Sequence, residues 1–226
     1  MRRLIKFLLR HGWSLPLGIL SVLCFAQLAW EVREQELGPI DEAISRWLQA
    51  SRGDWDTLML ILTHSGGERG MTTLCVSTVL GMLLLKQRKA ATFAAIGGIG
   101  AWLLSAALKL LFARARPEAT THYLIPVPSS FSFPSGHALG TTCVVGCVVV
   151  IVHALRAPRV WRVTVSGFAA LYVVGVAISR VYFGVHYPSD VLGGQLAGAA
   201  WVAALTGYFY PRLLPGEATS PTSNAS

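Results

Sequence analysis

Charged residues are scarce in this sequence. Asp, Glu, Lys and Arg make up 13% of its 226 residues, against about 25% in an ordinary globular domain. Hydrophobic residues make up 53%, and the few charges lie between long apolar runs. This pattern excludes an ordinary water-soluble domain. We therefore expect an all-α polytopic membrane protein built as one domain over residues 1–212.

Cysteines are also few, and none is placed for a disulfide framework or a thiolate metal site. The sequence has four, all within apolar runs: Cys24, Cys75, Cys143 and Cys147. Cys143 and Cys147 are one helical turn apart, but small core residues are the better interpretation. The face that we assign to the outside below also has no cluster of acids and histidines suited to Mg²⁺ or Zn²⁺. We expect no cofactor.

The N-terminal segment resembles a signal peptide, because several basic residues precede the apolar run Leu15–Trp30. No small-x-small cleavage site follows this run cleanly, since Gln27 stands two places before Ala29. We interpret the run as an uncleaved first span, with Trp13 and Trp30 as interfacial anchors.

Five further apolar runs are expected to span the membrane: Gly70–Leu85, Ala90–Phe112, Ser135–His153, Val163–Val181 and Ser189–Tyr210. Two stretches between the first and second spans are too short to cross, namely Asp41–Ala50 and Trp55–Thr63, the latter with Asp54 as its N-cap. We expect these to lie at the membrane surface or against the bundle. Residues 213–226 are rich in Pro, Ser and Thr, which predicts a disordered tail.

The net charge of +8 is explained by its distribution and does not indicate nucleic-acid binding. The N-terminus, the tail and the two loops on their side carry 11 Lys/Arg and one acid, whereas the opposite side carries 8 Lys/Arg and 10 acids. The positive-inside rule therefore predicts cytoplasmic termini for a six-span chain.

Several polar residues are predicted at the outer ends of three different spans. They are three cations, two histidines and one acid: Lys109, Arg116, Arg180, His137, His186 and Asp190. Each has an ordinary alternative. Lys109 and Arg180 could snorkel to the lipid interface, Asp190 could cap the last helix, and His186 could be a loop residue. These alternatives do not explain why all six converge, and charges at membrane depth are functional candidates.

The segment Phe133-Pro134-Ser135-Gly136-His137 opens the fourth span. We expect Pro134 in the first helical turn, followed by free amides at the positive end of the helix dipole, which bind anions. Gly136 lets a ligand approach the backbone. By itself this segment could also be a helix start with a capping serine and an incidental histidine.

A phosphoryl-transfer site accounts for all of these residues. Lys109, Arg116 and Arg180 would neutralise a phosphate dianion, and the amides of 135–137 with the Ser135 hydroxyl would complete the cradle. The attacking histidine must be neutral, with a carboxylate on its other nitrogen. His186 has Asp190 four residues away, whereas His137 has no acid close in sequence. His186 is therefore the expected nucleophile, Asp190 its orienting residue, and His137 the acid that protonates the leaving oxygen.

Three stretches, Lys109–Pro117, Pro134–His137 and Ser179–Asp190, resemble in order the signature motifs of the type 2 phosphatidic acid phosphatase superfamily. The resemblance implies a phosphohistidine at His186, an acid at His137 and phosphate binding by five residues: Lys109, Arg116, Ser135, Gly136 and Arg180. It also implies metal independence.

The orientation predicted from the charges places the site on the periplasmic face of the inner membrane, where an outward site at bilayer depth suits a lipid phosphate. We expect the loop 118–131, with His122 and Tyr123, to shape the headgroup pocket. Bacterial lipid phosphatases of this family are similar in their compact size and basic N-terminal region, which implies a phosphorylated lipid substrate. Undecaprenyl pyrophosphate is the first choice by analogy. Phosphatidylglycerophosphate, phosphatidic acid and lipid A are alternatives. A vanadate-dependent haloperoxidase would be soluble, and a non-catalytic membrane protein would be expected to lack one of the histidines.

Overall fold

The structure is a computed structural model that describes residues 14–117 and 124–213. These residues form helices joined by turns and loops, without a β-strand in either range. The helices are α2 (Ser14–Arg33), α3 (Gly38–Gln49), α4 (Asp56–Ser65), α5 (Glu68–Leu84), α6 (Arg88–Phe112), α7 (Gly136–Ala154), α8 (Arg159–Tyr182) and α9 (Pro188–Leu213). The predicted all-α class is confirmed.

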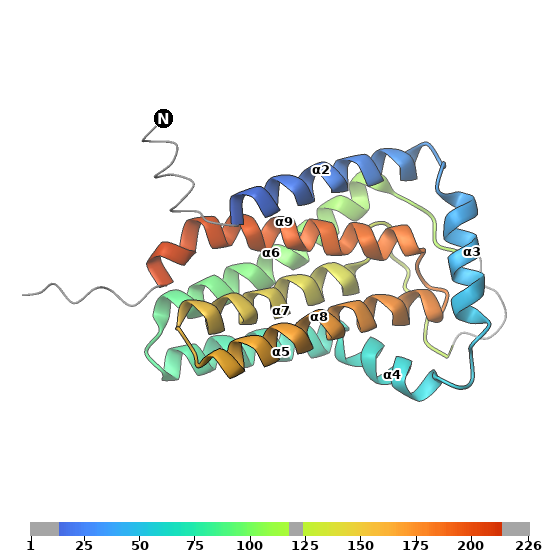
Figure 1. Ribbon diagram of the computed structural model, residues 1–226. Coiled ribbons are helices and arrows are strands. Elements are labelled where there is room, and N and C mark those ends of the chain that lie inside the picture. Colours follow the sequence, from blue (N-terminus) through green and yellow to red (C-terminus); the bar gives the residue numbers. More distant parts are fainter. Residues whose placement is uncertain (1–13, 118–123, 214–226) are drawn as a thin grey trace, which may run out of the picture.

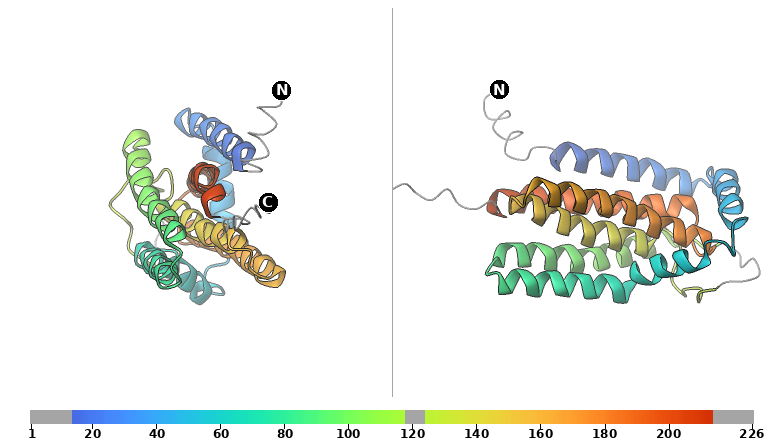
Figure 2. Two further views of the ribbon diagram at one scale, coloured as in Figure 1. Left: turned by 90° about the vertical axis from the view of Figure 1, so that its left-hand side faces the viewer. Right: turned by 60° about the horizontal axis from the view of Figure 1, so that its bottom comes forward.

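The long helices lie side by side in one bundle, and α3 crosses one end of it with α4 at the same end (Figures 1 and 2). α9 packs against α2, α6 and α7, while α7 also contacts α5 and α8. Both ends of the described chain lie at the opposite end of the bundle from α3 (Figure 1). Four helix ends therefore lie at the α3 end of the bundle (Figure 1). They are the first turns of α7 and α9 and the last turns of α6 and α8.

Within residues 14–117 and 124–213, four helices are long and apolar enough to cross a membrane: α2, α6, α7 and α8. The two remaining predicted spans correspond to α5, which has 17 residues, and to α9, which is rich in glycine and alanine. The bounds of all six predicted runs agree with these helices to within a few residues. Leu23, Leu110, Leu171 and other large apolar side chains point away from the bundle, as expected for a surface in contact with lipid.

Close contact between α7 and α9 depends on glycine. A Cβ atom at Gly194 would lie 2.5 Å from the Ser135 carbonyl oxygen, and one at Gly198 would lie 2.8 Å from Cβ of Thr142. Because these positions lack a side chain, α9 can approach the start of α7. The loop before α7 is anchored by Phe133, whose buried ring stacks on Phe25 with 5.8 Å between ring centroids.

Two local predictions were wrong. Asp54 does not cap α4, because the helix begins at Asp56 and Trp55 occupies the cap position without a side-chain hydrogen bond. Pro134 does not lie in the first turn of α7, which begins at Gly136 with Ser135 as its N-cap. The predicted tail beyond residue 213, the basic N-terminus, and His122 and Tyr123 lie outside the described residues.

Candidate active site

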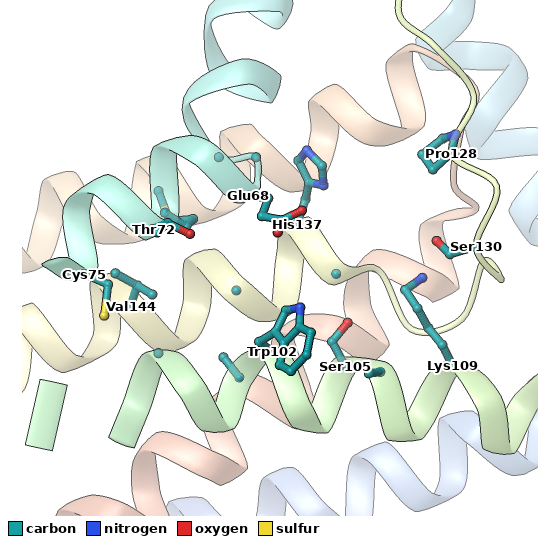
Figure 3. A pocket seen from close by; sticks show the side chains of 18 of the residues that line it. Glu68, Thr72, Cys75, Trp102, Ser105, Lys109, Pro128, Ser130, His137 and Val144 are labelled. Carbon is teal, nitrogen blue, oxygen red and sulfur yellow. The ribbon is translucent and has the colours of Figure 1, made fainter. Parts of the chain in front are cut away.

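A cavity of about 750 Å³ opens at the α3 end of the bundle, between α5, α6 and α7. Six of the eight residues predicted from sequence line it: Lys109, Arg116, Gly136, His137, Arg180 and His186. Figure 3 shows Lys109 and Ser105 of α6 and His137 of α7 around this space. The other two, Asp190 and Ser135, are fully buried. The structure thus brings together residues from four separate parts of the chain.

His186 and Asp190 form a buried pair, as predicted. Nδ1 of His186 lies 3.2 Å from Oδ2 of Asp190, and the two side chains are 2% and 0% exposed. Asp190 lies in the first turn of α9, and the same Oδ2 accepts a hydrogen bond of 2.9 Å from the Tyr187 amide. Asp190 therefore caps the start of α9 through the Tyr187 amide and also contacts His186, so the two positions expected of this carboxylate are compatible.

The tautomer of His186 follows from its neighbours. Nη1 of Arg116 lies 3.2 Å from Nε2. Because a guanidinium only donates hydrogen bonds, Nε2 must accept and Nδ1 must carry the proton towards Asp190. Burial lowers the pKa of His186 to about 3, an effect that outweighs the opposing influence of Asp190. His186 is thus a neutral imidazole near physiological pH, with a lone pair on the nitrogen that faces the cavity.

The three cations of the cavity are held by neutral oxygens. Lys109 donates to the Phe131 carbonyl, Arg116 donates to the Ser130 and Val185 carbonyls at 2.8 and 2.6 Å, and Arg180 donates to the Thr63 hydroxyl. In residues 14–117 and 124–213, none of the three forms an ion pair with a carboxylate. Nε of the buried Arg180 has no hydrogen-bond partner in those ranges either. Arg180 is buried, and Lys109 and Arg116 are partly buried. Positive charge removed from water without a counter-ion is costly, and an anion in the cavity would offset that cost.

The start of α7 supplies the other wall of the cavity. Gly136 lies close to α6, since a Cβ atom there would be 3.1 Å from Oγ of Ser105. Ser135 is not among the described residues that line the cavity. Its amide donates to the Asp190 carbonyl at 2.9 Å, and its hydroxyl accepts from the Ala138 amide at 3.5 Å. Ser135 therefore takes part in the contact between α7 and α9 and in the cap of α7.

Comparison with known proteins identifies the family. The model of the PAP2 superfamily matches residues 72–213. This chain belongs to the PAP2 superfamily. It is 32% identical over 178 residues to phosphatidylglycerophosphatase B of Bacillus subtilis, covering 78% of this chain and 86% of that protein. It is 33% identical over 153 residues to the undecaprenyl-diphosphatase of Sulfolobus acidocaldarius, covering 66% of this chain and 68% of that one.

A solved structure shows the same family fold. The crystal structure of a transmembrane PAP2-type phosphatidylglycerolphosphate phosphatase from Bacillus subtilis superimposes with a TM-score of 0.76 at 30% sequence identity. The match covers 84% of this chain and 94% of that one. The present chain is thus a multi-pass membrane protein and a PAP2-type phosphatase, a hydrolase of phosphoric esters or diphosphates.

Sequence reasoning missed the polar residues behind this PAP2 site. Arg114 bridges Asp41 of α3 and Asp190 of α9, and the Ser132 hydroxyl donates to Oδ2 of Asp190. Arg114 stands two residues before Arg116, so its place within the first motif was an available signal. Asp41 had none, because its partners are more than 70 residues away in sequence.

The acidic and histidine side chains of the PAP2 site do not form a metal-binding set. The part of the chain that the structure describes contains no group of three or more His, Cys, Asp or Glu residues placed to hold a metal ion. The positive charge at the cavity comes from Lys and Arg side chains instead.

Proposed function

We propose that this protein hydrolyses the phosphate of a membrane lipid through a phosphohistidine at His186, without a metal ion. The observation that carries the proposal is the cavity itself. Three cations, which form no ion pair with an acid among the described residues, line the cavity together with His186, whose Nε2 contacts Arg116 and whose Nδ1 is backed by a buried carboxylate. A phosphate dianion would supply the missing negative charge and present its phosphorus to Nε2.

The reaction has two steps. Nε2 of His186 attacks phosphorus, the bond to the leaving oxygen breaks, and His137 donates a proton to that oxygen. His137 then takes a proton from water, whose oxygen attacks the phosphohistidine and releases inorganic phosphate. Lys109, Arg116 and Arg180 neutralise the equatorial oxygens in both steps. The amides at the start of α7 assist them. Ser135 would contribute its hydroxyl after release from the Ala138 amide.

The cavity continues from the cations into an apolar region, which supports a lipid substrate. Met71, Cys75 and Val76 of α5 and Ile99 and Trp102 of α6 line this part, and Figure 3 shows Cys75, Trp102 and Val144 there. Val76, Ile99 and Trp102 are also exposed on the surface of the bundle. A lipid could thus place its phosphate at the cations while its chains stay in contact with apolar side chains.

Two lipids are the leading candidates. Undecaprenyl pyrophosphate is the choice made from the sequence, and a relative named for undecaprenyl diphosphate supports it. Phosphatidylglycerophosphate is the second candidate, because the Bacillus subtilis phosphatidylglycerophosphatase B is matched over most of both chains. Phosphatidic acid and lipid A follow, the latter with support from a lipid A 1-phosphatase of Rhizobium etli.

We further propose six spans with α5 and α9 among them, both termini in the cytoplasm and the site on the periplasmic face of a bacterial inner membrane. The described chain supports this arrangement, since its two ends lie opposite α3 and the site (Figure 1). The excess of Lys and Arg on the side of the termini points the same way. In this orientation α3 and α4 would lie at the outer interface.

Phosphate release from purified protein in detergent tests the function. Wild type, His186→Asn and the exposed control His64→Asn are each given undecaprenyl pyrophosphate, phosphatidylglycerophosphate, phosphatidic acid and lipid A. We expect His186→Asn to lose at least about 10³-fold in kcat, and the control to keep wild-type rates. The lipid with the highest kcat/KM is the substrate class. Turnover by His186→Asn would remove the nucleophile assignment.

A further inference from the structure

We propose that Arg114 and Asp41 are positioning residues that hold the Asp190 carboxylate in the orientation His186 requires. The inference rests on the proposed role of His186 as nucleophile. Arg114 joins two buried acids from different helices. Its Nη1 lies 2.7 Å from Oδ1 of Asp190, and its Nη2 lies 2.9 Å from Oδ2 of Asp41. The two carboxylates are 0% and 2% exposed.

The two oxygens of Asp190 have separate partners. Oδ2 faces Nδ1 of His186 and also accepts from the Tyr187 amide and the Ser132 hydroxyl. Oδ1 accepts from Arg114. Arg114 therefore sets the rotation of the carboxylate about its χ2 angle, and with it the oxygen that is presented to the imidazole.

Asp41 completes the arrangement from the other side. Its Oδ1 accepts from the Ser189 amide at 2.9 Å, and its Oδ2 accepts from the Ser189 hydroxyl and from Arg114. The Ser189 hydroxyl in turn accepts from Nη1 of Arg114 at 2.7 Å. Asp41 thus clamps both the guanidinium and the residue immediately before Asp190.

Asp41 is one of the points at which α3 docks on the bundle, and Leu48, which packs against the cluster that includes Ala177 and Val181 of α8, is another. Asp41 is its buried residue, whereas Ile40, Ile44 and Trp47 are exposed. An amphipathic helix usually buries its apolar side chains. Here the acid contacts Arg114, and α3 itself crosses one end of the bundle (Figure 1).

Neither Arg114 nor Asp41 is among the described residues that line the cavity. Their influence on the reaction must therefore pass through Asp190. The other charged or titratable groups that act on Asp190 are His186, Lys109, Arg116 and Tyr187. Of these groups and Arg114, it is Arg114 that donates a direct hydrogen bond to Oδ1, and its guanidinium also lies 4.3 Å from the centre of the Tyr187 ring.

The test compares Asp41→Asn with Glu42→Gln, its exposed neighbour on α3. Both substitutions turn a carboxylate into an amide. The amide introduced at position 41 would place a donor group beside a guanidinium, which cannot accept a hydrogen bond. We expect Asp41→Asn to lower kcat about 10-fold or more, with KM and product inhibition by inorganic phosphate within about 2-fold of wild type. Glu42→Gln should keep wild-type kinetics.

Arg114→Lys and Arg114→Gln extend the test. Lysine keeps the charge but cannot bond both acids through a planar fork, so kcat should lie between wild type and the glutamine variant. If Arg114→Gln does not fold, Asp41→Asn and Arg114→Lys carry the comparison. Unchanged kcat in both of these variants would overturn the proposal, as would a parallel loss of kcat and phosphate affinity, which indicates a merely structural role. Failure of the nucleophile assignment is seen separately, as turnover by His186→Asn.

Discussion

Arg116 places Nη1 3.2 Å from Nε2 of His186, on the side of the imidazole opposite Asp190. The ring is thus held between a cation and an acid, with its proton on the acid side and its lone pair towards the cation. When phosphate enters the cavity, its oxygens offer Arg116 a stronger acceptor than a neutral nitrogen. The contact with Arg116 that sets the tautomer would thus release the lone pair for attack once substrate is bound.

This relationship predicts that Arg116→Lys is a damaging substitution, although it preserves the charge. Lysine has no fixed fork with which to contact the Ser130 and Val185 carbonyls and the phosphate together. We expect kcat/KM for lipid phosphate release to fall about 10²-fold. Arg69→Lys on α5, which is exposed and outside the lining of the cavity, is the matched control. Equal kinetics in the two variants would mean that Arg116 acts only as a point charge.

A second prediction separates the roles of the two histidines. If His137 protonates the leaving oxygen, His137→Ala should impair hydrolysis of phosphatidic acid, a monoester whose leaving group is an alkoxide, about 10²- to 10³-fold. It should impair p-nitrophenyl phosphate much less, because nitrophenolate leaves without a proton. His186→Asn should impair both substrates alike. Values of kcat/KM with the two substrates measure this, because they report the first step, in which the leaving oxygen departs, and not the later attack of water. An equal loss of kcat/KM on both substrates by His137→Ala would contradict the assignment.

The low pKa of His186 makes a prediction about pH and stability. Between its folded pKa of about 3 and its ordinary value near 6.5, the unfolded chain binds a proton at His186 that the native chain does not. The free energy of unfolding should therefore fall as the pH is lowered from about 6.5, by at most about 1.4 kcal/mol per pH unit from this residue. Thermal unfolding in detergent between pH 4 and 7.5 measures the slope.

One variant isolates the contribution of His186 to that slope. His186→Asn should show a shallower dependence of stability on pH than wild type. An identical slope in the two proteins would mean that His186 is protonated as easily in the native state as in the unfolded one.

Removal of metal ions should leave activity intact. The proposed reaction uses Lys109, Arg116 and Arg180 where other phosphatases use metal charge. We expect phosphate release to persist after dialysis against EDTA and to be inhibited by vanadate, which would occupy the phosphate position. Loss of activity in EDTA, with recovery on addition of Mg²⁺ or Zn²⁺, would show that a metal takes part.

Much of the fold could be predicted because a membrane-spanning helix is recognisable from the length and apolar composition of its own stretch of sequence. The run Ala90–Phe112 corresponds to α6 at Arg88–Phe112 since apolar composition alone decides where such a helix lies. The pairing of His186 with Asp190 was also accessible, because a spacing of four residues brings the two together at the start of a helix.

The remaining features depend on tertiary contacts that have no local signal. Asp41 meets Arg114 across 73 residues of chain. Ser135 lies within a recognisable motif, but its amide is taken by the Asp190 carbonyl, which only the register of α7 against α9 determines. Asp54 was favoured as a helix cap by residue type, yet the helix starts at Asp56, whose Oδ1 accepts from the Tyr182 hydroxyl at 2.6 Å.

The register of α7 against α9 leaves no room for a side chain at Gly194. A Cβ atom there would lie 2.5 Å from the Ser135 carbonyl oxygen and 3.0 Å from the Leu139 amide nitrogen, both backbone atoms that cannot turn aside. Gly194→Ala should push the start of α7 away from α9 and misplace His137, lowering stability by about 1–3 kcal/mol and kcat about 10-fold or more.

Gly167→Ala on α8 is the matched control, because no described atom outside its own helix turn lies within 4 Å of its Cβ position. Helix propensity there favours alanine by up to about 1 kcal/mol. The measurements are the thermal unfolding temperature and the kcat for phosphate release, compared between the two variants. If Gly194→Ala is as stable and as active as Gly167→Ala, the contact between α7 and α9 does not determine the geometry of the site.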